Sequence, residues 1–191
     1  MSTRKDELAR TAARLFAERG FHGTSMGDLA DAMGVQKASL YSLTGSKQQL
    51  LSDAVRTGAE AFHEALDGVD DDAHAVERIR QALRGHLRVV SDQLDAATVF
   101  IREWRYLEGD LRDEFVAERR RYEARWRDLF REGVERGELR TDLHASDAAL
   151  LVLSAANWAY TWLTPSTDTD ALADRFVAIL VDGVRGYATP E

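Results

Sequence analysis

The chain has 191 residues, which is long enough to bury a sizeable core as one or two domains. It contains no cysteine, and this excludes a disulfide framework and a thiolate metal site. The formal net charge is −8, which at first sight argues against a nucleic-acid partner. No apolar stretch follows a basic start at the N-terminus, so we expect no secretory signal and a cytoplasmic location.

The charge is distributed unevenly along the chain. Residues 1–50 contain seven Lys and Arg against five Asp and Glu, whereas residues 51–191 contain eighteen against twenty-eight. All three lysines, Lys5, Lys37 and Lys47, lie in the first of these segments. A mildly basic head on an acidic body suits a protein that presents one end to phosphate. Because the positive excess is small, we expect high affinity to require two heads that bind together.

The pattern of apolar residues predicts an all-α fold. Only two prolines occur, Pro165 and Pro190, and no segment alternates apolar and polar residues as a half-buried strand does. The helical period and the breaks at glycine predict about nine helices with short connections. Their expected spans are about 3–19, two short helices within 25–43, and then 46–66, 73–91, 96–106, 111–136, 146–163 and 169–187.

The two short helices form the most informative part of the pattern. Ser25 and Asp28 have the spacing of a capping box, in which the acidic half is weakened because Asp is shorter than Glu. Gly34 lies where a left-handed residue would end the first short helix, and Ser46 is placed to cap the helix that follows the second. Two short helices joined by a glycine-containing turn are typical of a helix-turn-helix unit, whose second helix enters the DNA major groove.

The outer face of the second short helix favours this interpretation over a helical hairpin in an ordinary bundle. It carries amide, ammonium, hydroxyl and phenol groups, which suit base edges and phosphates. Lys37 and Lys47 each lie near the start of a helix, where a cation is unfavourable to the helix dipole. A phosphate partner would explain both positions.

Residues 10–51 resemble the DNA-binding domain of the TetR family of bacterial repressors. The matching positions are Leu15, Phe16, Gly20, Thr24, Ser25, Gly34, Val35, Leu40, Tyr41, Gly45, Ser46 and Lys47. One position departs from the family, because Thr44 stands where a Phe usually precedes the Gly-Ser-Lys segment. The resemblance implies a DNA-binding domain over residues 1–48 and a helical ligand-binding and dimerisation domain over 49–191.

By the same resemblance, eight side chains are expected to contact operator DNA. Thr24, Ser25 and Lys47 would anchor phosphates. The residues expected in the groove are Gln36, Lys37, Ala38, Tyr41 and Ser42.

The stretch 148–167 contains no charged residue, and its length would allow a membrane span. It contains Ser154, Asn157 and Pro165 and lacks basic flanks, so we interpret it as a buried helix and expect no membrane partner. In TetR-like proteins the last two helices pair with those of a second copy. The residues that this implies for a homodimer interface, rather than for the core of a monomer, are Leu151, Val152, Ala155, Ala159, Phe176, Ile179, Leu180 and Val184.

Aromatic residues recur at helical spacing in the body, where each taken alone is more typical of ordinary core. In TetR-like regulators this part of the body holds a small-molecule cavity. The candidate pocket residues are Phe100, Trp104, Tyr122, Trp126, Phe130, Asn157, Trp158 and Trp162. The arginine-rich segment 109–143 is loosely similar to members that respond to acyl-CoA thioesters. The expected effector is therefore an acyl-CoA thioester or another amphipathic anion.

The main hypothesis is a ligand-responsive transcriptional repressor that binds a palindromic operator as a homodimer and is released by a small molecule. One alternative is a helical small-molecule-binding protein with weak or lost DNA binding, which the small head charge and Thr44 keep open. An enzyme is the other alternative. The five histidines are scattered, with no HExxH motif, P-loop or nucleophile elbow, so we expect no catalysis, no metal and no cofactor.

Overall fold

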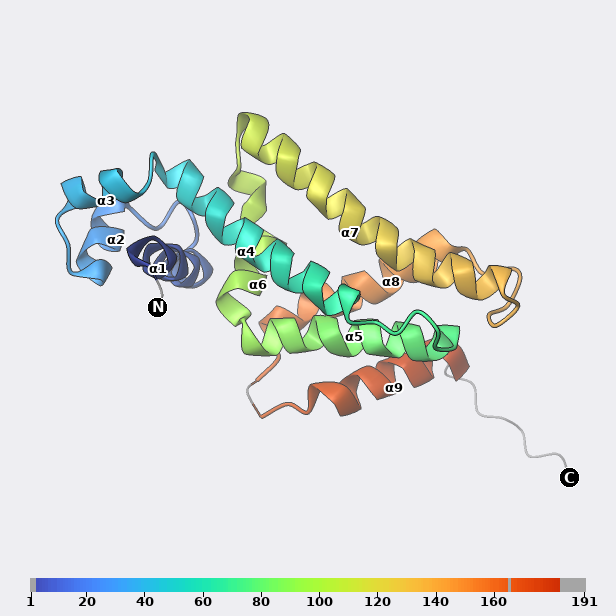
Figure 1. The fold of residues 1–191 in the computed structure, drawn as a ribbon. Helices are drawn as coiled ribbons and strands as arrows, with labels where there is room; N and C mark the ends of the chain where they lie inside the picture. The colour runs from blue at the N-terminus through green and yellow to red at the C-terminus, as the bar shows by residue number, and fades with distance from the viewer. Residues whose placement is uncertain (1–2, 165, 183–191) are drawn as a thin grey trace, which may run out of the picture. The chain divides into compact units, whose positions relative to one another are not determined.

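The computed structural model describes residues 3–164 and 166–182, and within these ranges it confirms the all-α prediction (Figure 1). The described part contains nine α-helices, two short 3₁₀ segments and no strand. The elements are α1 (Arg4–Arg19), α2 (Met26–Met33), α3 (Lys37–Leu43), α4 (Lys47–Asp67), α5 (Ala75–Asp92), α6 (Leu94–Arg102), η1 (Glu103–Tyr106), α7 (Gly109–Glu135), α8 (Ala145–Trp158), η2 (Ala159–Thr161) and α9 (Thr169–Asp182).

Two expected helices are shorter than the sequence pattern indicated. The sixth was expected to continue to Tyr106, but the α-helix ends at Arg102 and a 3₁₀ turn follows. The eighth was expected to continue to Leu163, but it gives way to η2 after Trp158. No described helix is both long enough and apolar enough to cross a membrane.

The chain packs as two compact units. The N-terminal unit comprises Met1–Glu64 and Asp92–Glu123, and the C-terminal unit comprises Ala65–Ser91 and Ala124–Glu191. Both α4 and α7 therefore contribute residues to each unit. The functional division into residues 1–48 and 49–191 remains a prediction, because these units divide the chain at other positions.

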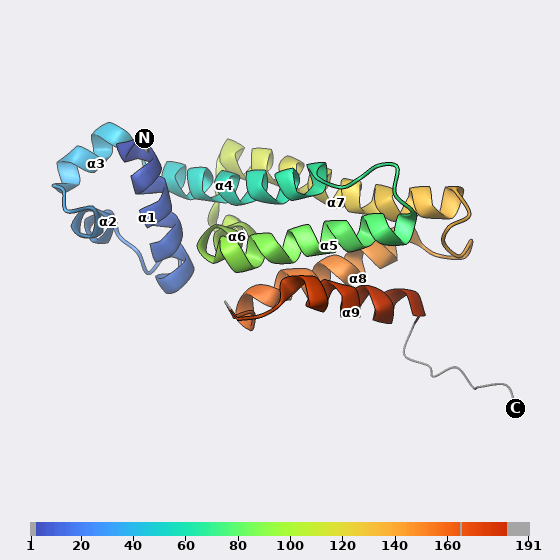
Figure 2. The same cartoon turned by 60° about the horizontal axis from the view of Figure 1, so that its bottom comes forward.

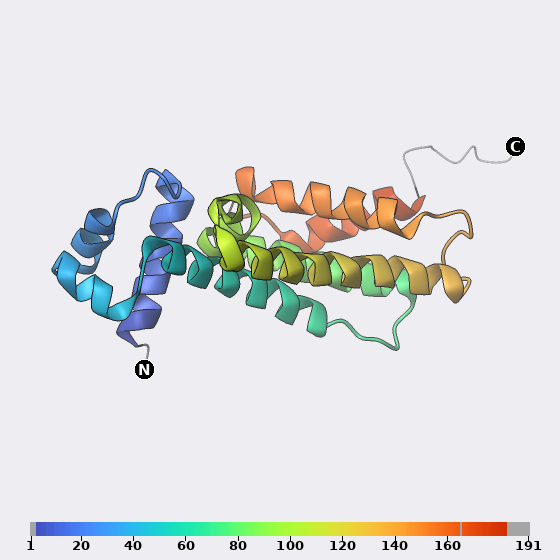
Figure 3. The ribbon, with the colours of Figure 1, turned by 90° about the horizontal axis from the view of Figure 1, so that it is seen from above.

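The N-terminal unit is built on α1 and α6, which pack against each other. Thr3 caps α1 through a complete capping box with Asp6. The side chains of Leu8 and Phe16 are fully buried. Helix α2 packs on α1 and on α3, and the tight turn between α2 and α3 is visible in Figure 3.

The C-terminal unit contains α5, α8 and α9, which lie side by side in Figure 2, together with the second half of α7. Trp126 and Phe130 of α7 fill its interior with less than 2% of each side chain exposed. His86 of α5 is also fully buried and forms a hydrogen bond with the backbone of Ala156 in α8.

Candidate functional site

The helix-turn-helix unit is held by a complete capping box. The Ser25 hydroxyl accepts a hydrogen bond from the Asp28 backbone N–H at 3.1 Å, and the Asp28 carboxylate accepts one from the Ser25 N–H at 2.7 Å. Both halves are therefore present, although Asp is shorter than the Glu that is usual at this position. The hydrogen bonds from Ser25 are the main cause that lowers the pKa of Asp28.

Gly34 ends α2 in the left-handed conformation, with φ of 63°. Its N–H bonds back to Ala30 and Asp31, which closes the turn before α3 begins at Lys37. A residue with a Cβ would be strained at this φ, so the glycine has a conformational reason for its position.

Helix α3 presents a polar face to solvent while a single leucine anchors it. Leu40 is fully buried. Tyr41, the next residue, points away from this core with 52% of its surface exposed. The other exposed members of the expected groove set are Gln36, Lys37, Ala38 and Ser42. The side chains expected to read DNA are therefore accessible in this unit.

Of the three expected phosphate anchors, the structure contradicts Thr24. Its side chain is only 1% exposed, and its hydroxyl donates to the carbonyls of Leu15 and Gly20 at 3.2 and 3.0 Å. The prediction for this residue is wrong because a buried hydroxyl must satisfy its hydrogen bond within the protein. Ser25 is exposed, although its hydroxyl also caps α2.

Lys47 occupies the first position of α4. The preceding residue, Ser46, caps this helix, because its hydroxyl accepts a hydrogen bond from the Gln49 N–H at 3.0 Å. The ammonium lies 4.1 Å from the centroid of the Phe21 ring, which is a cation–π geometry. Partial burial lowers the pKa of Lys47, while Asp28 nearby raises it. The lysine is thus held against the Phe21 ring at the start of α4.

Thr44 occupies a packed position, although the family usually has Phe there. Its side chain is 6% exposed, and its hydroxyl donates to the Ser46 carbonyl at 3.2 Å. Thr44 is in extended conformation at the end of α3, so the smaller residue replaces packing with a local hydrogen bond.

A cavity of about 550 Å³ lies within the N-terminal unit between α4 and the first half of α7. Its apolar wall is formed by Val55, Ala59, Leu107, Leu111, Phe115 and Ala117. The polar and charged lining consists of Ser52, Arg56, Glu60, His63, Glu114, Glu118 and Arg121. A cavity with an apolar wall and a few convergent polar groups is the usual form of a small-molecule site.

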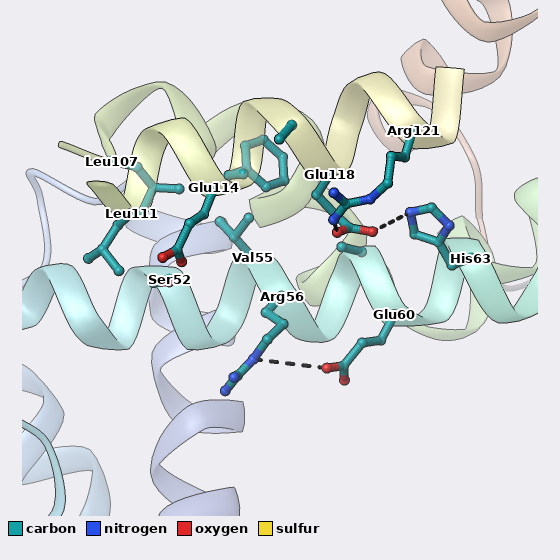
Figure 4. A pocket seen from close by; sticks show the side chains of 13 residues that line it. Ser52, Val55, Arg56, Glu60, His63, Leu107, Leu111, Glu114, Glu118 and Arg121 are labelled. Atoms are coloured by element: carbon teal, nitrogen blue, oxygen red, sulfur yellow. Dashed lines mark hydrogen bonds and ion pairs between the residues drawn. The ribbon is translucent and has the colours of Figure 1, made fainter. Parts of the chain in front are cut away.

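The charged groups of the cavity are partly paired with one another, as Figure 4 shows. Glu118 lies between His63, at 2.7 Å from its Nε2, and Arg121. Arg56 pairs with Glu60 along α4 at 3.9 Å. The lining has three carboxylates against two guanidinium groups and one imidazole. A ligand would therefore have to bind mainly through its apolar part.

None of the eight aromatic and amide residues expected to form the pocket lines this cavity. Phe100, Tyr122, Trp126 and Phe130 are buried as packing residues, while Asn157 is half-buried. Trp158 and Trp162 are 63% and 43% exposed, so neither is enclosed as expected. Trp104 is half-buried and packs on the cavity residue Phe115 with the ring centroids 5.4 Å apart.

The residues that line the observed cavity follow a different sequence pattern from the predicted aromatic residues. Val55, Ala59 and His63 recur every fourth residue on α4, and Leu111 and Phe115 do so on α7. This is a mixed stripe of small, apolar and charged side chains. Of the predicted aromatic residues, Phe100 and Trp104 pack on a residue of the apolar cavity wall, Phe115, with ring centroids 5.5 and 5.4 Å away.

The C-terminal unit carries large apolar side chains in solvent on α8 and α9. Leu151 and Ile179 of the expected interface are 62% and 55% exposed, and Leu150, which precedes Leu151 in the chain, is 67% exposed. Ala155 is exposed, and Phe176 and Leu180 are half-buried.

Two members of the expected interface are corrected by the structure. Val152 and Ala159 are buried within the unit, because they lie on the inner face of α8 and at the start of η2. Val184 lies outside the described residues.

Comparison with known families decides the wider assignment. Residues 8–54 match the model of bacterial regulatory proteins of the tetR family, and residues 72–184 match the tetracyclin repressor-like C-terminal domain. The chain belongs to the TetR family.

Among the relatives of this TetR-family chain is the HTH-type transcriptional repressor KstR2 of Mycobacterium tuberculosis H37Rv. The two are 25% identical over 189 residues, which cover 96% of this chain and 94% of KstR2. The crystal structure of the TetR family regulator PfmR from Thermus thermophilus is similar, with a TM-score of 0.89, 28% identity and coverage of 97% and 99% of the two chains.

A third similar structure is AibR in complex with isovaleryl coenzyme A and operator DNA. It has a TM-score of 0.86 and 30% identity, and the match covers 94% of this chain and 98% of AibR. The TetR-family regulators therefore match this chain over both its helix-turn-helix segment and its body. This confirms the family resemblance carried by the segment from Leu15 to Lys47.

Proposed function

We propose that this TetR-family chain is a repressor that binds a palindromic operator as a homodimer and is released by a small molecule bound in its own cavity. The exposed polar face of α3, anchored by buried Leu40, is the observation that carries the proposal. AibR, which is 30% identical, has been solved with operator DNA, and this supports the same use of the helix here.

Homodimerisation is supported by the large apolar side chains exposed on α8 and α9 of the C-terminal unit. Several large apolar side chains left in solvent on two helices of one unit suit an interaction surface. A two-fold axis would place two copies of α3 in successive major grooves, about 34–36 Å apart. Two heads acting together would compensate for the small positive charge of each.

The cavity between α4 and α7 is the proposed effector site. Its wall of Val55, Ala59, Leu111 and Phe115 suits a short acyl or alicyclic group. AibR binds isovaleryl coenzyme A, so an acyl-CoA thioester remains the effector class to examine first. The three carboxylates of the lining disfavour an anionic group inside the cavity, so the charged part of such a ligand would stay outside it.

Replacing Lys37 and Tyr41 with Ala tests the DNA-binding surface. We expect affinity for a duplex from the region upstream of the gene to fall about 100-fold, because each lost contact costs roughly 1–3 kcal/mol. The melting temperature should change little, since both side chains are exposed. Fluorescence anisotropy and calorimetry measure the two quantities.

Lys5→Ala is the matched control, because it removes the same charge from an exposed position of α1. It should leave specific affinity within about threefold, the scale of one screened surface charge. If the wild-type protein bound this duplex no better than an unrelated one, the chain would instead be a helical binding protein without sequence-specific DNA recognition. Catalysis is not proposed, because the relatives are named as transcriptional regulators.

A further inference from the structure

An ion pair between buried Glu103 and half-buried Arg102 holds the end of α1 from a distant part of the N-terminal unit. Glu103 is 3% exposed, and one of its carboxylate oxygens accepts the backbone N–H of Phe21 at 2.7 Å. Its other oxygen accepts the Arg102 Nε–H at 2.6 Å. The Arg102 guanidinium also donates to the carbonyls of Ala17 and Phe16, at 2.8 and 3.4 Å.

These contacts satisfy backbone groups at the point where α1 ends and the helix-turn-helix segment begins. The last carbonyls of a helix have no partner within the helix, and a cation near them is favourable to the helix dipole. Phe21 follows Gly20, which ends α1. Arg102 and Glu103 therefore form hydrogen bonds with backbone groups on both sides of this junction. We call these two residues the latch.

The same short segment contacts and precedes residues of the cavity wall. Glu103 begins η1, and the next residue, Trp104, packs on cavity residue Phe115 with the ring centroids 5.4 Å apart. The Trp104 carbonyl accepts the N–H of Leu107 at 3.0 Å, and Leu107 lines the cavity with 1% of its surface exposed. Arg119 of α7 covers the Trp104 ring at 5.1 Å.

A second set of contacts connects η1 to the N-terminal head, residues 1–50. The Tyr106 ring stacks on Phe21 at 6.0 Å and meets the His22 ring edge-on at 4.6 Å. Its carbonyl accepts the side-chain N–H of Gln48, which lies beside Lys47 at the start of α4. Along η1, Trp104 packs against the cavity wall, while Glu103 and Tyr106 contact the head.

We infer that the latch transmits occupancy of the cavity to the DNA-binding helices, with Arg102 and Glu103 acting as positioning residues. This inference rests on the proposed function. A ligand against Phe115 and Leu107 displaces η1, and the displacement changes how Glu103 holds Phe21. A switching role is favoured over plain stabilisation because the Arg102 side chain is 35% exposed, and an ion pair with a solvent-exposed partner adds little net stability.

The test is a double-mutant cycle in which a side chain stands in for the ligand. Ala59→Phe places a ring into the cavity from α4, where Ala59 is buried and lines the wall. In the wild-type background we expect this substitution to weaken binding to the upstream duplex at least tenfold, within the usual range of allosteric coupling. In the Glu103→Gln background the same substitution should change affinity less than twofold.

The ratio between backgrounds separates transmission from mere structural support. A structural role for Glu103 would change basal affinity or melting temperature and leave the tenfold ratio intact. Glu108→Gln is the matched control, because Glu108 is exposed two residues after η1 and loses the same charge. If Ala59→Phe does not fold, Ala117→Phe fills the cavity from α7. If Glu103→Gln does not fold, Arg102→Lys weakens the latch from its other side.

Hydrogen exchange at the Phe21 amide supplies a readout that does not depend on DNA. Ala59→Phe should speed exchange of this amide at least tenfold when Glu103 is present and less than twofold in Glu103→Gln. If Ala59→Phe changed exchange and affinity by the same factor in both backgrounds, or had no effect in the wild-type background, the proposed role of the latch would be wrong. The proposal of DNA binding would not be affected by that result. Absence of specific DNA binding by the wild type would overturn the proposed function, and the exchange data would then decide the latch alone.

Discussion

His86 on α5 is a fully buried histidine whose ring meets Trp126 edge-on at 6.3 Å. Burial lowers its pKa from 6.5 to about 3, while the hydrogen bond to the Ala156 backbone acts in the opposite direction. The imidazole is therefore neutral in the folded protein, and it takes up a proton in the unfolded chain below about pH 6.5.

This difference in pKa predicts a specific acid sensitivity. Stability from the neutral imidazole is fully present above about pH 6.5 and is lost as the pH falls toward 3, at about 1.4 kcal/mol per pH unit. We expect His86→Gln to flatten the decline of unfolding free energy between pH 6.5 and 4.5, measured by urea titration. His144→Gln, at an exposed position, is the control. Parallel pH curves for wild type and His86→Gln would contradict the prediction.

Thr24 is a second single residue whose role the sequence did not reveal: it matches the family pattern, but it does not have the predicted role of a phosphate anchor. Its hydroxyl bonds to Leu15 and Gly20 inside the unit, so it stabilises the turn after α1 instead of reaching DNA. A threonine before a helix start has no local signal that distinguishes these roles. Only its burial against α1 does so.

At the scale of elements, the sequence predicted those helices whose ends are set locally. Ser25 and Ser46 each cap a helix as their spacing indicated. Gly34 ends α2 as expected. These signals are reliable because a cap is satisfied by backbone groups within three residues.

Elements set by distant contacts were not predictable in this way. The apolar pattern continues from Ala96 to Tyr106, but α6 stops at Arg102, where Glu103 turns to bond Phe21, 82 residues earlier in the chain. The cavity was missed for a related reason. Phe100 and Tyr122 meet Phe62 at ring distances of 4.8 and 5.8 Å and form solid core, and no local feature shows that the neighbouring stripe on α4 leaves space.

A ladder of arginine–aspartate pairs connects α5 to α9 within the C-terminal unit. Arg84 donates to both carboxylate oxygens of Asp174 at 2.6 and 2.8 Å, and Arg80 lies 3.4 Å from the same carboxylate. One turn away, Arg88 pairs with Asp170 and is the main cause that lowers its pKa. Residues four apart on each helix thus align to hold α9 against α5.

These ion pairs should add only modestly to the free energy of unfolding, and the contribution should depend on salt, because the side chains of Arg84 and Asp174 are 30% and 45% exposed. A double-mutant cycle of Arg84→Ala and Asp174→Ala should give a coupling of roughly 0.5–1 kcal/mol in unfolding free energy at low salt. At 1 M salt the coupling should fall by about half or more, since the Debye length is then about 3 Å. A coupling that does not change with salt would show that packing, and not charge, joins the two helices.

At the scale of the whole molecule, the apolar face of α8 and α9 determines whether one chain can act alone. Leu150, Leu151 and Ile179 are each more than half exposed. A two-fold axis through this face would bury each such side chain in both copies of the chain, because an isologous interface uses the same residues of both subunits. For the same reason, a single substitution would place two charges in the interface.

We therefore expect Leu151→Glu to raise the dimer dissociation constant at least 100-fold, because burying two like charges without partners costs several kcal/mol. Sedimentation velocity over a range of concentrations measures this directly. Operator affinity should fall in parallel, since a single mildly basic head retains few phosphate contacts. The melting temperature, extrapolated to low concentration, should stay close to that of the wild type.

Leu94→Glu is the matched control for this substitution. Leu94 is also exposed, at 42%, but it begins α6 in the N-terminal unit. If both variants stayed dimeric and bound DNA like the wild type, the face on α8 and α9 would not be the interface. If only Leu151→Glu became monomeric and lost the operator, two heads would be needed because each carries so little positive charge.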